Sequence, residues 1–259
     1  MFLCLHGWAQ EHDALLMVHF GTTFDDTRSK TIDAINERAR LSFPGRTVAE
    51  AYTSPRVMKR LAEKGIRKDS PVDALLRLRA QGIRSVSVQP TFVIDGKEMD
   101  LLRRQVEQVR PFFDTIRMGT PLLYSVEDAE HVCRILAARH TVPPKGGAAV
   151  FIGHGTEGPA TALYSQLDYM FHALGYGNCH VATIEGYPTL QTVTAALKAQ
   201  RAKQVTLVPL LFVAGDHANI DISSEWKAAL EAEGFQVSVR LEGLGEVPEI
   251  QALYIDKAR

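Results

Sequence analysis

The sequence of 259 residues has little of several features that mark particular classes of protein. It has only three cysteines, Cys4, Cys133 and Cys179, and no CxxC or other metal-ligand spacing between them. This usage predicts free thiols in a reducing compartment and excludes a disulfide framework. The chain also has no excess of positive or negative charge, because 29 Lys and Arg residues balance 30 Asp and Glu residues to a net charge of −1. We therefore expect neither nucleic acid nor an anionic membrane as a partner.

Long hydrophobic runs are absent as well. The longest apolar runs, such as residues 148–152 and 205–214, are as long as strands. They fall short of the ~20 residues that a membrane helix needs. Residues 1–9 are mildly apolar but have no basic residue before them, which makes a poor secretory signal. We interpret residues 1–12 as an N-terminal extension and expect a cytoplasmic protein.

What the sequence does contain is enough apolar material for a large core, with 46% apolar and 23% charged residues. This composition excludes disordered, collagen and coiled-coil classes. Short β-rich runs alternate with segments of helical period, which is typical of an α/β protein with helices on both faces of a parallel sheet. The predicted strands are 14–20, 48–53, 85–92, 115–119, 148–153, 179–184, 204–213 and 236–241. The predicted helices are 26–41, 56–64, 71–81, 98–109, 127–138, 159–174, 190–200, 223–233 and 248–257.

The two halves of the chain resemble each other, as in an internal duplication. His19-Phe20-Gly21-Thr22 resembles Gly153-His154-Gly155-Thr156, and Val88–Val93 resembles Val208–Val213. Pro143-Pro144 followed by Gly146-Gly147 marks a linker. We predict two similar, doubly wound parallel-sheet domains, residues 1–125 and 126–259, facing a central cleft. Ligands of such sheets bind beyond the carboxyl ends of the strands.

Three segments of the second half follow predicted strands, and each carries a side chain that can bind a metal. These side chains are His154, Glu185 and His217. Two histidines and one glutamate suit borderline divalent metals such as Co(II), Ni(II), Fe(II) or Zn(II). His154 alone is equally typical of a helix cap or a buried structural histidine. Three such residues at one sheet edge favour a metal site, while Asp216 is expected to cap the following helix.

The first half offers hydrogen-bond donors after its strands but no nucleotide-binding motif. Its candidates for ligand binding are Gly21, Thr22, Thr23, Thr53, Ser54 and Arg56. Hydroxyls and free backbone N–H groups of this kind suit carboxylates or phosphates. Arg56 alone is more typical of a solvated helix face. GxGxxG, GxxxxGK[ST] and GxSxG are all missing, so dinucleotide, P-loop and α/β-hydrolase interpretations have no support.

The segments around these residues resemble a known family. The segments concerned are Val18–Thr22, Ala51–Ser54, Phe151–Gly155, Ile184–Pro188, Val208–Leu210 and Val213–Ala218. They are similar to those of the anaerobic sirohydrochlorin cobaltochelatases, class II chelatases related in fold to protoporphyrin ferrochelatase. The resemblance runs from about Ala14 to near the C-terminus. It implies an enzyme that inserts Co(II) into sirohydrochlorin, or precorrin-2, in anaerobic cobalamin biosynthesis and consumes no nucleotide.

Residue by residue, the resemblance implies that His154 and His217 are the active-site histidines and that Glu185 is the metal-site glutamate. Metallation removes two pyrrolic N–H protons while a divalent ion loses its waters. A neutral imidazole can serve as base or as exchangeable ligand at pH 7, because its reference pKa is about 6.5. We assign His154 as the proton acceptor and Glu185 and His217 as metal ligands, with the division between the two histidines open. The hydroxyls and Arg56 of the first half would hold the substrate's carboxylates.

The sequence departs from the family pattern in two places. Gln89-Pro90-Thr91-Phe92 stands where relatives usually have a histidine, which argues against a ligand role for the first half and against haem. Residues Ala218–Trp226 form a shorter segment than the usual acidic loop before its tryptophan. This shortening leaves the choice of metal open.

Three alternative functions remain beside cobalt insertion. One is the same chemistry with Fe(II) or Ni(II), which ligand type alone does not separate. Another is a non-catalytic tetrapyrrole or metal carrier. The third, a periplasmic solute-binding protein, would need an export signal, and we find none. The expected partners are sirohydrochlorin, a divalent metal and further copies of the chain in a homo-oligomer.

Overall fold

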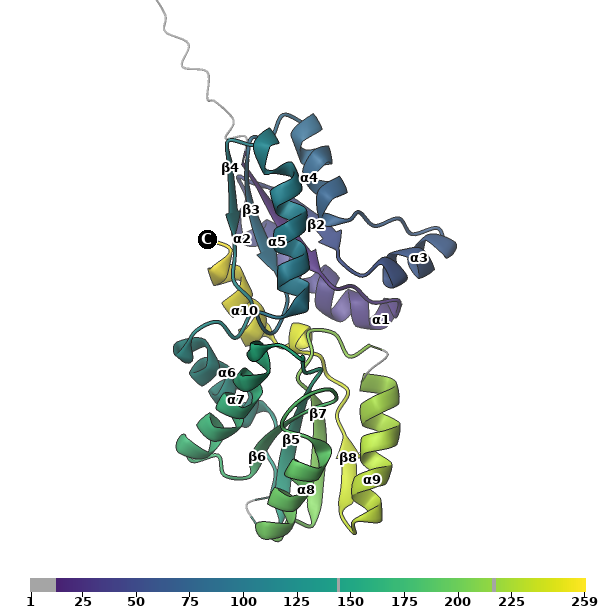
Figure 1. Ribbon diagram of the computed structural model, residues 1–259, viewed down its shortest axis with the longest axis vertical. Coiled ribbons are helices and arrows are strands. Elements are labelled where there is room, and N and C mark those ends of the chain that lie inside the picture. Colours follow the sequence, from purple (N-terminus) through teal and green to yellow (C-terminus); the bar gives the residue numbers. More distant parts are fainter. Residues whose placement is uncertain (1–12, 144, 216–217) are drawn as a thin grey trace, which may run out of the picture.

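The computed structural model describes residues 13–143, 145–215 and 218–259. For residues 218 and 219 it describes the backbone only. The predicted extension, residues 1–12, lies outside the described residues. Two units, each a sheet with helices around it, are stacked along the long axis of the molecule (Figure 1). Within the described ranges, no helix combines the length and apolarity needed to cross a membrane.

The first sheet has four parallel strands in the order β2-β1-β3-β4. They are β1 (Asp13–His19), β2 (Thr47–Tyr52), β3 (Ser85–Pro90) and β4 (Thr115–Met118). The helical elements of this half are α1 (Asp25–Arg28), the π-helix η1 (Ser29–Asp33), α2 (Ala34–Ser42), α3 (Pro55–Glu63), α4 (Pro71–Ala80), α5 (Lys97–Val109) and η2 (Arg110–Phe112). Ser54 and Ser70 accept backbone N–H groups at the starts of α3 and α4, and a proline follows each cap. These local signals fix where both helices begin.

The second sheet repeats the arrangement in the order β6-β5-β7-β8. Its strands are β5 (Gly147–Gly153), β6 (Cys179–Thr183), β7 (Gln204–Pro209) and β8 (Gln236–Val239). The remaining helical elements are α6 (Val126–Arg139), η3 (Pro159–Thr161), α7 (Ala162–Ala173), α8 (Leu190–Ala199), η4 (Ala218–Trp226), α9 (Lys227–Ala232), η5 (Leu244–Glu246) and α10 (Pro248–Lys257). Two parallel sheets of the same topology confirm the predicted fold class.

The register shows how the two halves correspond. Val18 pairs with Pro90 in the first sheet, and Ile152 pairs with Pro209 in the second. The prolines are therefore equivalent, and the predicted match of Val88–Val93 with Val208–Val213 was wrong by one residue. Gly21 and Gly155 both have positive φ, at 100° and 89°, as the match between the segments that contain them requires.

Strands β3 and β7 end earlier than predicted, at Pro90 and Pro209. The sequence analysis extended both strands because apolar residues continue beyond the prolines. Phe92, Leu210 and Phe212 are indeed buried. Leu210 and Phe212 pack in a cluster that both halves share, so their apolar character reflects packing between the sheets.

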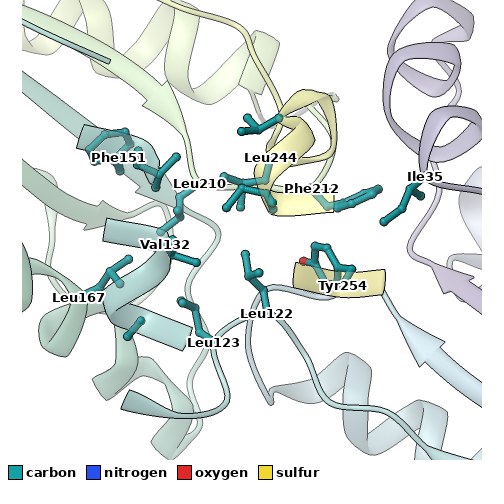
Figure 2. Close-up of a cluster of buried hydrophobic side chains, with 14 of the residues drawn as sticks. Ile35, Leu122, Leu123, Val132, Phe151, Leu167, Leu210, Phe212, Leu244 and Tyr254 are labelled. Atoms are coloured by element: carbon teal, nitrogen blue, oxygen red, sulfur yellow. The ribbon is translucent and has the colours of Figure 1, made fainter. Parts of the chain in front are cut away.

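Among the described residues, buried apolar side chains form three clusters, and one of them is shared by the two halves. Alternate residues of β1 face opposite sides, and Leu15 and Met17 belong to the shared cluster together with Phe151 of β5. Figure 2 shows Phe212, Leu244 and Tyr254 between residues of the two halves. A common core of this kind fixes the two sheets relative to each other.

The last helix, α10, contacts the first half although it follows the second sheet. The Tyr254 hydroxyl lies 3.1 Å from the carbonyl oxygens of both Thr91 and Phe92. The Arg38 guanidinium donates to the Pro248 carbonyl oxygen at 2.6 Å. The boundary between residues 125 and 126 stays a prediction, and α10 connects the two sides of it.

Candidate active site

A cavity of about 390 Å³ lies between the two halves, lined by segments that follow the strands. The first half contributes residues after β1, β2 and β3, and the second half contributes residues after β5, β6 and β7. This is the position at which open parallel sheets bind their ligands. Among the predicted site residues, the lining includes Gly21, Thr22, Thr23, Ser54, Arg56, His154 and Glu185.

His154 and Glu185 are brought together by the backbone. Their segments extend the pairing of β5 and β6 by one step, because the Glu185 N–H donates to the His154 carbonyl oxygen at 2.8 Å. Gly155 makes this approach possible, since a Cβ atom there would overlap the carbonyl oxygen of Glu185. The His154 side chain is half-buried and that of Glu185 is exposed. An imidazole and a carboxylate thus share one wall of the cavity.

Tyr164 of α7 supports this wall, and the sequence analysis did not single it out. Its ring fills the space that a side chain at Gly153 would need. Its hydroxyl oxygen accepts the Gly155 N–H at 3.4 Å. Burial raises the pKa of Tyr164 to about 12, so the side chain stays neutral near the cavity that it lines. No pattern in the sequence indicated this contact, because it joins a helix to a strand end through tertiary packing and a hydrogen bond.

The opposite wall repeats this backbone arrangement with different side chains. The Ser54 N–H donates to the Phe20 carbonyl oxygen at 3.2 Å, as Glu185 donates to His154. Phe20 and Ser54 therefore occupy the positions equivalent to His154 and Glu185. Phe20 is 44% exposed and lines the cavity. One wall thus carries metal-ligand groups, and the other carries an aromatic ring and a hydroxyl.

Thr53 is the predicted binding residue that does not line the cavity. It is buried, and its hydroxyl donates to the Glu98 carboxylate at 3.2 Å. Glu98 itself lines the cavity near the start of α5. Thr53 therefore helps to hold the start of α5 beside the cavity.

Positive side chains gather at the cavity from two helices of the first half. Arg56 and Arg60 of α3 and Lys97 of α5 all line it. The Lys97 ammonium pairs with the Glu157 carboxylate of the second half at 2.7 Å. This hydrogen bond raises the pKa of Lys97 and lowers that of Glu157, and both groups are exposed. The sequence analysis missed Arg60, although its spacing of four from Arg56 places both on one helix face.

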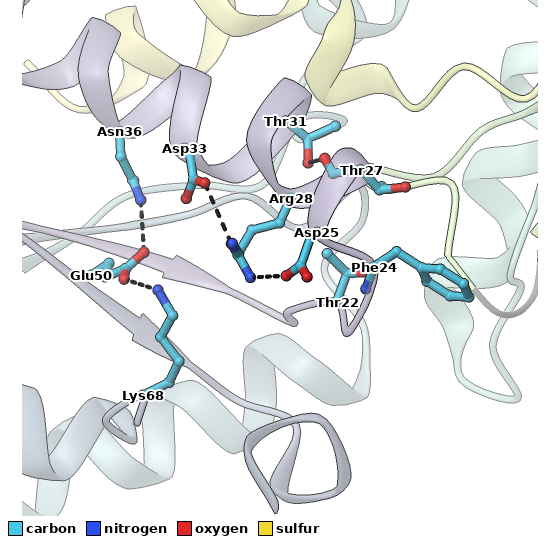
Figure 3. Close-up of polar contacts among 10 residues, drawn as sticks. All are labelled: Thr22, Phe24, Asp25, Thr27, Arg28, Thr31, Asp33, Asn36, Glu50 and Lys68. Atoms are coloured by element: carbon cyan, nitrogen blue, oxygen red, sulfur yellow. Dashed lines mark hydrogen bonds and ion pairs between the residues drawn. The ribbon is translucent and has the colours of Figure 1, made fainter. Parts of the chain in front are cut away.

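Beneath the first-half wall lies a polar network (Figure 3). The Thr22 hydroxyl oxygen accepts the Phe24 N–H at 3.2 Å, and Arg28 donates to Asp25 at 2.7 Å. Farther along, Asn36 donates to Glu50 at 2.9 Å, and Glu50 pairs with Lys68. The first two contacts lie within the turn after β1 and within α1, and the other two connect α2 and the segment before α4 to β2.

His19 is buried at the end of β1, where this network begins. Its Nε2 lies 3.0 Å from the Asn36 amide oxygen, and its Nδ1 lies 3.0 Å from the Thr91 hydroxyl. Because the Asn36 NH₂ group donates to Glu50, its oxygen receives the His19 N–H. Burial lowers the pKa of His19 to about 4. The ring is thus neutral at pH 7, and the hydrogen bonds at both nitrogens give it a structural role.

The third predicted ligand, His217, lies outside the described residues, as does the helix cap predicted for Asp216. Gly215, directly before them, lines the cavity.

Two lobes of like topology thus face each other across a cavity whose wall carries an imidazole and a carboxylate. A family model described as cobalt chelatase (CbiK) matches residues 13–259. The sirohydrochlorin cobaltochelatase of Salmonella typhimurium is 35% identical over 247 residues, covering 93% of each chain. The sirohydrochlorin cobaltochelatase CbiKC of Nitratidesulfovibrio vulgaris is 32% identical over 249 residues, covering 93% of this chain and 88% of its own. The chain therefore belongs to the cobalt chelatase (CbiK) family, and the protein is a metal chelatase.

A solved structure agrees on the fold. The sirohydrochlorin chelatase SirB from Bacillus subtilis subspecies spizizenii, in complex with cobalt, matches with a TM-score of 0.66. The alignment has 14% identity and covers 95% of this chain and 94% of that one. Identity this low supports the shared architecture alone.

Proposed function

We propose that this chelatase inserts Co(II) into sirohydrochlorin, or precorrin-2, in anaerobic cobalamin biosynthesis. The observation that carries the proposal is the placement of His154 and Glu185 on one wall of the cavity between the halves. The two relatives described above, at 35% and 32% identity, are both named sirohydrochlorin cobaltochelatase. Cobalt enters the reaction as a substrate, and the reaction requires no nucleotide.

In this proposal the second half performs the chemistry. His154 accepts pyrrolic protons, while Glu185 and His217 bind the metal ion transiently, with His154 able to share in binding. The hydrogen bond from the Glu185 N–H to the His154 carbonyl keeps base and ligand adjacent. Fixed proximity of this kind avoids the entropic cost of assembling the groups around the substrate. Tyr164 holds the wall in place from behind.

The first half holds the macrocycle. Phe20 offers an aromatic surface on the wall opposite His154, where it can pack against a flat or saddled ring. Thr22, Thr23 and Ser54 supply hydroxyls, and the backbone at Gly21 approaches the cavity closely. The guanidinium of Arg56 receives substrate carboxylates, assisted by Arg60 and Lys97. Local positive charge at the cavity compensates for the near-neutral protein as a whole.

The remaining parts of the proposal concern the domains, the cellular compartment and the partners of the enzyme. Residues 1–125 and 126–259 form the two domains, which work together because their active site lies between them. Cys133 and Cys179 are free thiols, which supports a reducing cytoplasm. We further propose a homo-oligomer that works without haem, nucleic acid or a membrane.

The deciding experiment is anaerobic metallation of sirohydrochlorin with Co(II), Fe(II) or Ni(II), followed by absorbance. We expect Co(II) insertion to be accelerated. Whichever of His154→Ala and His217→Ala removes the proton acceptor should lose roughly 10²-fold or more, as removal of an acid–base group does, and our assignment predicts His154→Ala. His131→Ala changes an exposed histidine of α6 and should retain the wild-type rate.

Each alternative has its own outcome in this experiment. Faster insertion of Fe(II) or Ni(II) than of Co(II) would keep the site and change the metal. Binding of the macrocycle without accelerated metal insertion would show that the protein is a carrier and not an enzyme. Full activity in both histidine variants would refute the assigned roles.

A further inference from the structure

A second group of metal-ligating side chains lies away from the cavity. Asp168 and His172 belong to α7, and His180 belongs to β6. One ligand atom from each of the three lies within 4.8 Å of the others. We call this group the α7–β6 cluster. None of its members lines the cavity between the halves.

The cluster is separated from the proposed catalytic ligands by the length of a strand. His180 is near the amino end of β6, whereas Glu185 follows its carboxyl end. Five residues of extended chain span about 16 Å. An ion at the α7–β6 cluster would therefore be separate from the ion handled by His154 and Glu185.

Local structure prepares each of the three side chains. The spacing of four puts Asp168 and His172 on one face of α7. β6 is an edge strand of its sheet, and its outward-facing Val181 N–H donates to the Asp168 carboxylate at 2.8 Å. This bond orients the carboxylate, as outer hydrogen bonds do for metal ligands.

His180 supplies a second, independent observation. Its side chain is 4% exposed, and its Nδ1 lies 3.9 Å from the Asp168 carboxylate oxygen. An ion shared with Asp168 would bind at this Nδ1, which faces the carboxylate.

The distances suit one ion. Ligands that each bind at 2.0–2.1 Å can be at most about 4.2 Å apart, and the His180–Asp168 pair already satisfies this limit. His172 is exposed and its ring is next to that of His180, with centroids 5.2 Å apart. Rotation of the exposed ring can supply the remaining approach, on the order of 1 Å.

We propose that the α7–β6 cluster is a second metal site, which binds one divalent ion of the Zn(II), Co(II) or Ni(II) type through two imidazoles and one carboxylate. Water completes the coordination, because His172 faces solvent. This ligand set belongs to borderline transition metals and not to Mg²⁺ or Ca²⁺, which prefer oxygen. A bound ion links α7 to β6, the edge strand of the second sheet, and stabilises that half. The proposal does not depend on the identity of the tetrapyrrole substrate.

The test is equilibrium dialysis with Zn(II) on the full chain carrying His154→Ala, Glu185→Gln and His217→Ala, which removes the proposed cavity ligands. We expect this parent to bind one Zn(II) at the cluster. Adding His172→Ala or Asp168→Asn should weaken binding by at least the 10- to 100-fold that loss of an outer partner costs. Asp168→Asn keeps an oxygen for the Val181 N–H. The matched control is His131→Ala, since His131 is also an exposed helical histidine.

Thermal unfolding distinguishes an ion bound at the cluster from one bound elsewhere. Zn(II) should raise the Tm of the parent and of the His131→Ala form, by roughly 5 °C at a hundredfold excess over Kd, but not that of the His172→Ala form. Equal affinity with and without His172, or no Zn(II) uptake by the parent, would overturn the proposal. In the otherwise wild-type chain, His172→Ala should keep normal Co(II) insertion, so failure of this site and failure of the chelatase proposal give different results.

Discussion

Gly155 sets the distance between the two segments that carry His154 and Glu185. Its φ of 89° is costly for any other residue, and a Cβ atom there would overlap the Glu185 carbonyl oxygen. Gly21 of the first half also has a positive φ, but there the ring of Tyr52, not a backbone carbonyl, fills the space beside it. The close approach of two backbone segments through a glycine is thus a feature of the wall that carries His154 and Glu185.

Gly155→Ala therefore tests whether this approach matters for catalysis. We expect it to cut Co(II) insertion by roughly 10²-fold, as small misplacements of reacting groups do. Gly175→Ala is the matched control, because Gly175 has φ 87° and no atom within 4 Å of its would-be Cβ. Both variants place a Cβ atom on left-handed backbone, at a cost of roughly 1–2 kcal/mol in denaturant unfolding. Gly155→Ala must in addition move the Glu185 segment away, so it alone should lose activity. Similar activities in the two variants would contradict this role for Gly155.

At the scale of elements, local patterns predicted most of the fold. The alternation of strands and helices and the sheet edge bearing His154 and Glu185 both follow from short-range signals. Contacts between segments that are distant in the sequence could not be predicted from these local patterns. Tyr164 behind Gly153 depends on three-dimensional packing, for which a single sequence provides no period or motif.

Helix α3 offers an element-scale test, because it presents Arg56 and Arg60 to the cavity and Lys59 to solvent. Arg56→Ala should raise KM for sirohydrochlorin by roughly tenfold while kcat changes little, since a carboxylate bound equally in ground and transition states affects binding only. Lys59→Ala removes one positive charge from the same helix and should leave KM unchanged at moderate salt. The comparison of steady-state constants separates a specific contact from general electrostatic attraction, and an equal rise in KM for both variants would favour the latter.

At the scale of the whole molecule, the two halves behave as one body because they share a core. His19 stacks on Phe212 with ring centroids 6.1 Å apart, and His140 packs edge-on against Phe151 at 5.6 Å. Both histidines are buried. Protonation of either histidine would therefore disturb the packing of the shared cluster. His19 does so from the first half, and His140 does so from the end of α6.

Stability should consequently fall as the pH drops from 7 to 5. Burial lowers the pKa of His19 and of His140 to about 4, whereas the unfolded value is near 6.5. In this window the unfolded chain binds protons that the folded chain does not, so acid favours unfolding. Each histidine should contribute a loss on the order of 2 kcal/mol by pH 5. The neighbouring Glu242 has a lowered pKa, set by its hydrogen bond to Arg139, and titrates below this range.

Urea unfolding at pH 7 and pH 5 measures this loss for the wild type and for His140→Gln, which removes the titrating group with a polar side chain of similar size. The variant should be less stable at pH 7 but show a smaller decrease between the two pH values. His131→Ala, which changes an exposed histidine, should keep the full decrease. If His140→Gln keeps it as well, His140 is protonated in the folded state, and the Glu242 carboxylate 3.7 Å from its Nε2 must outweigh the effect of burial.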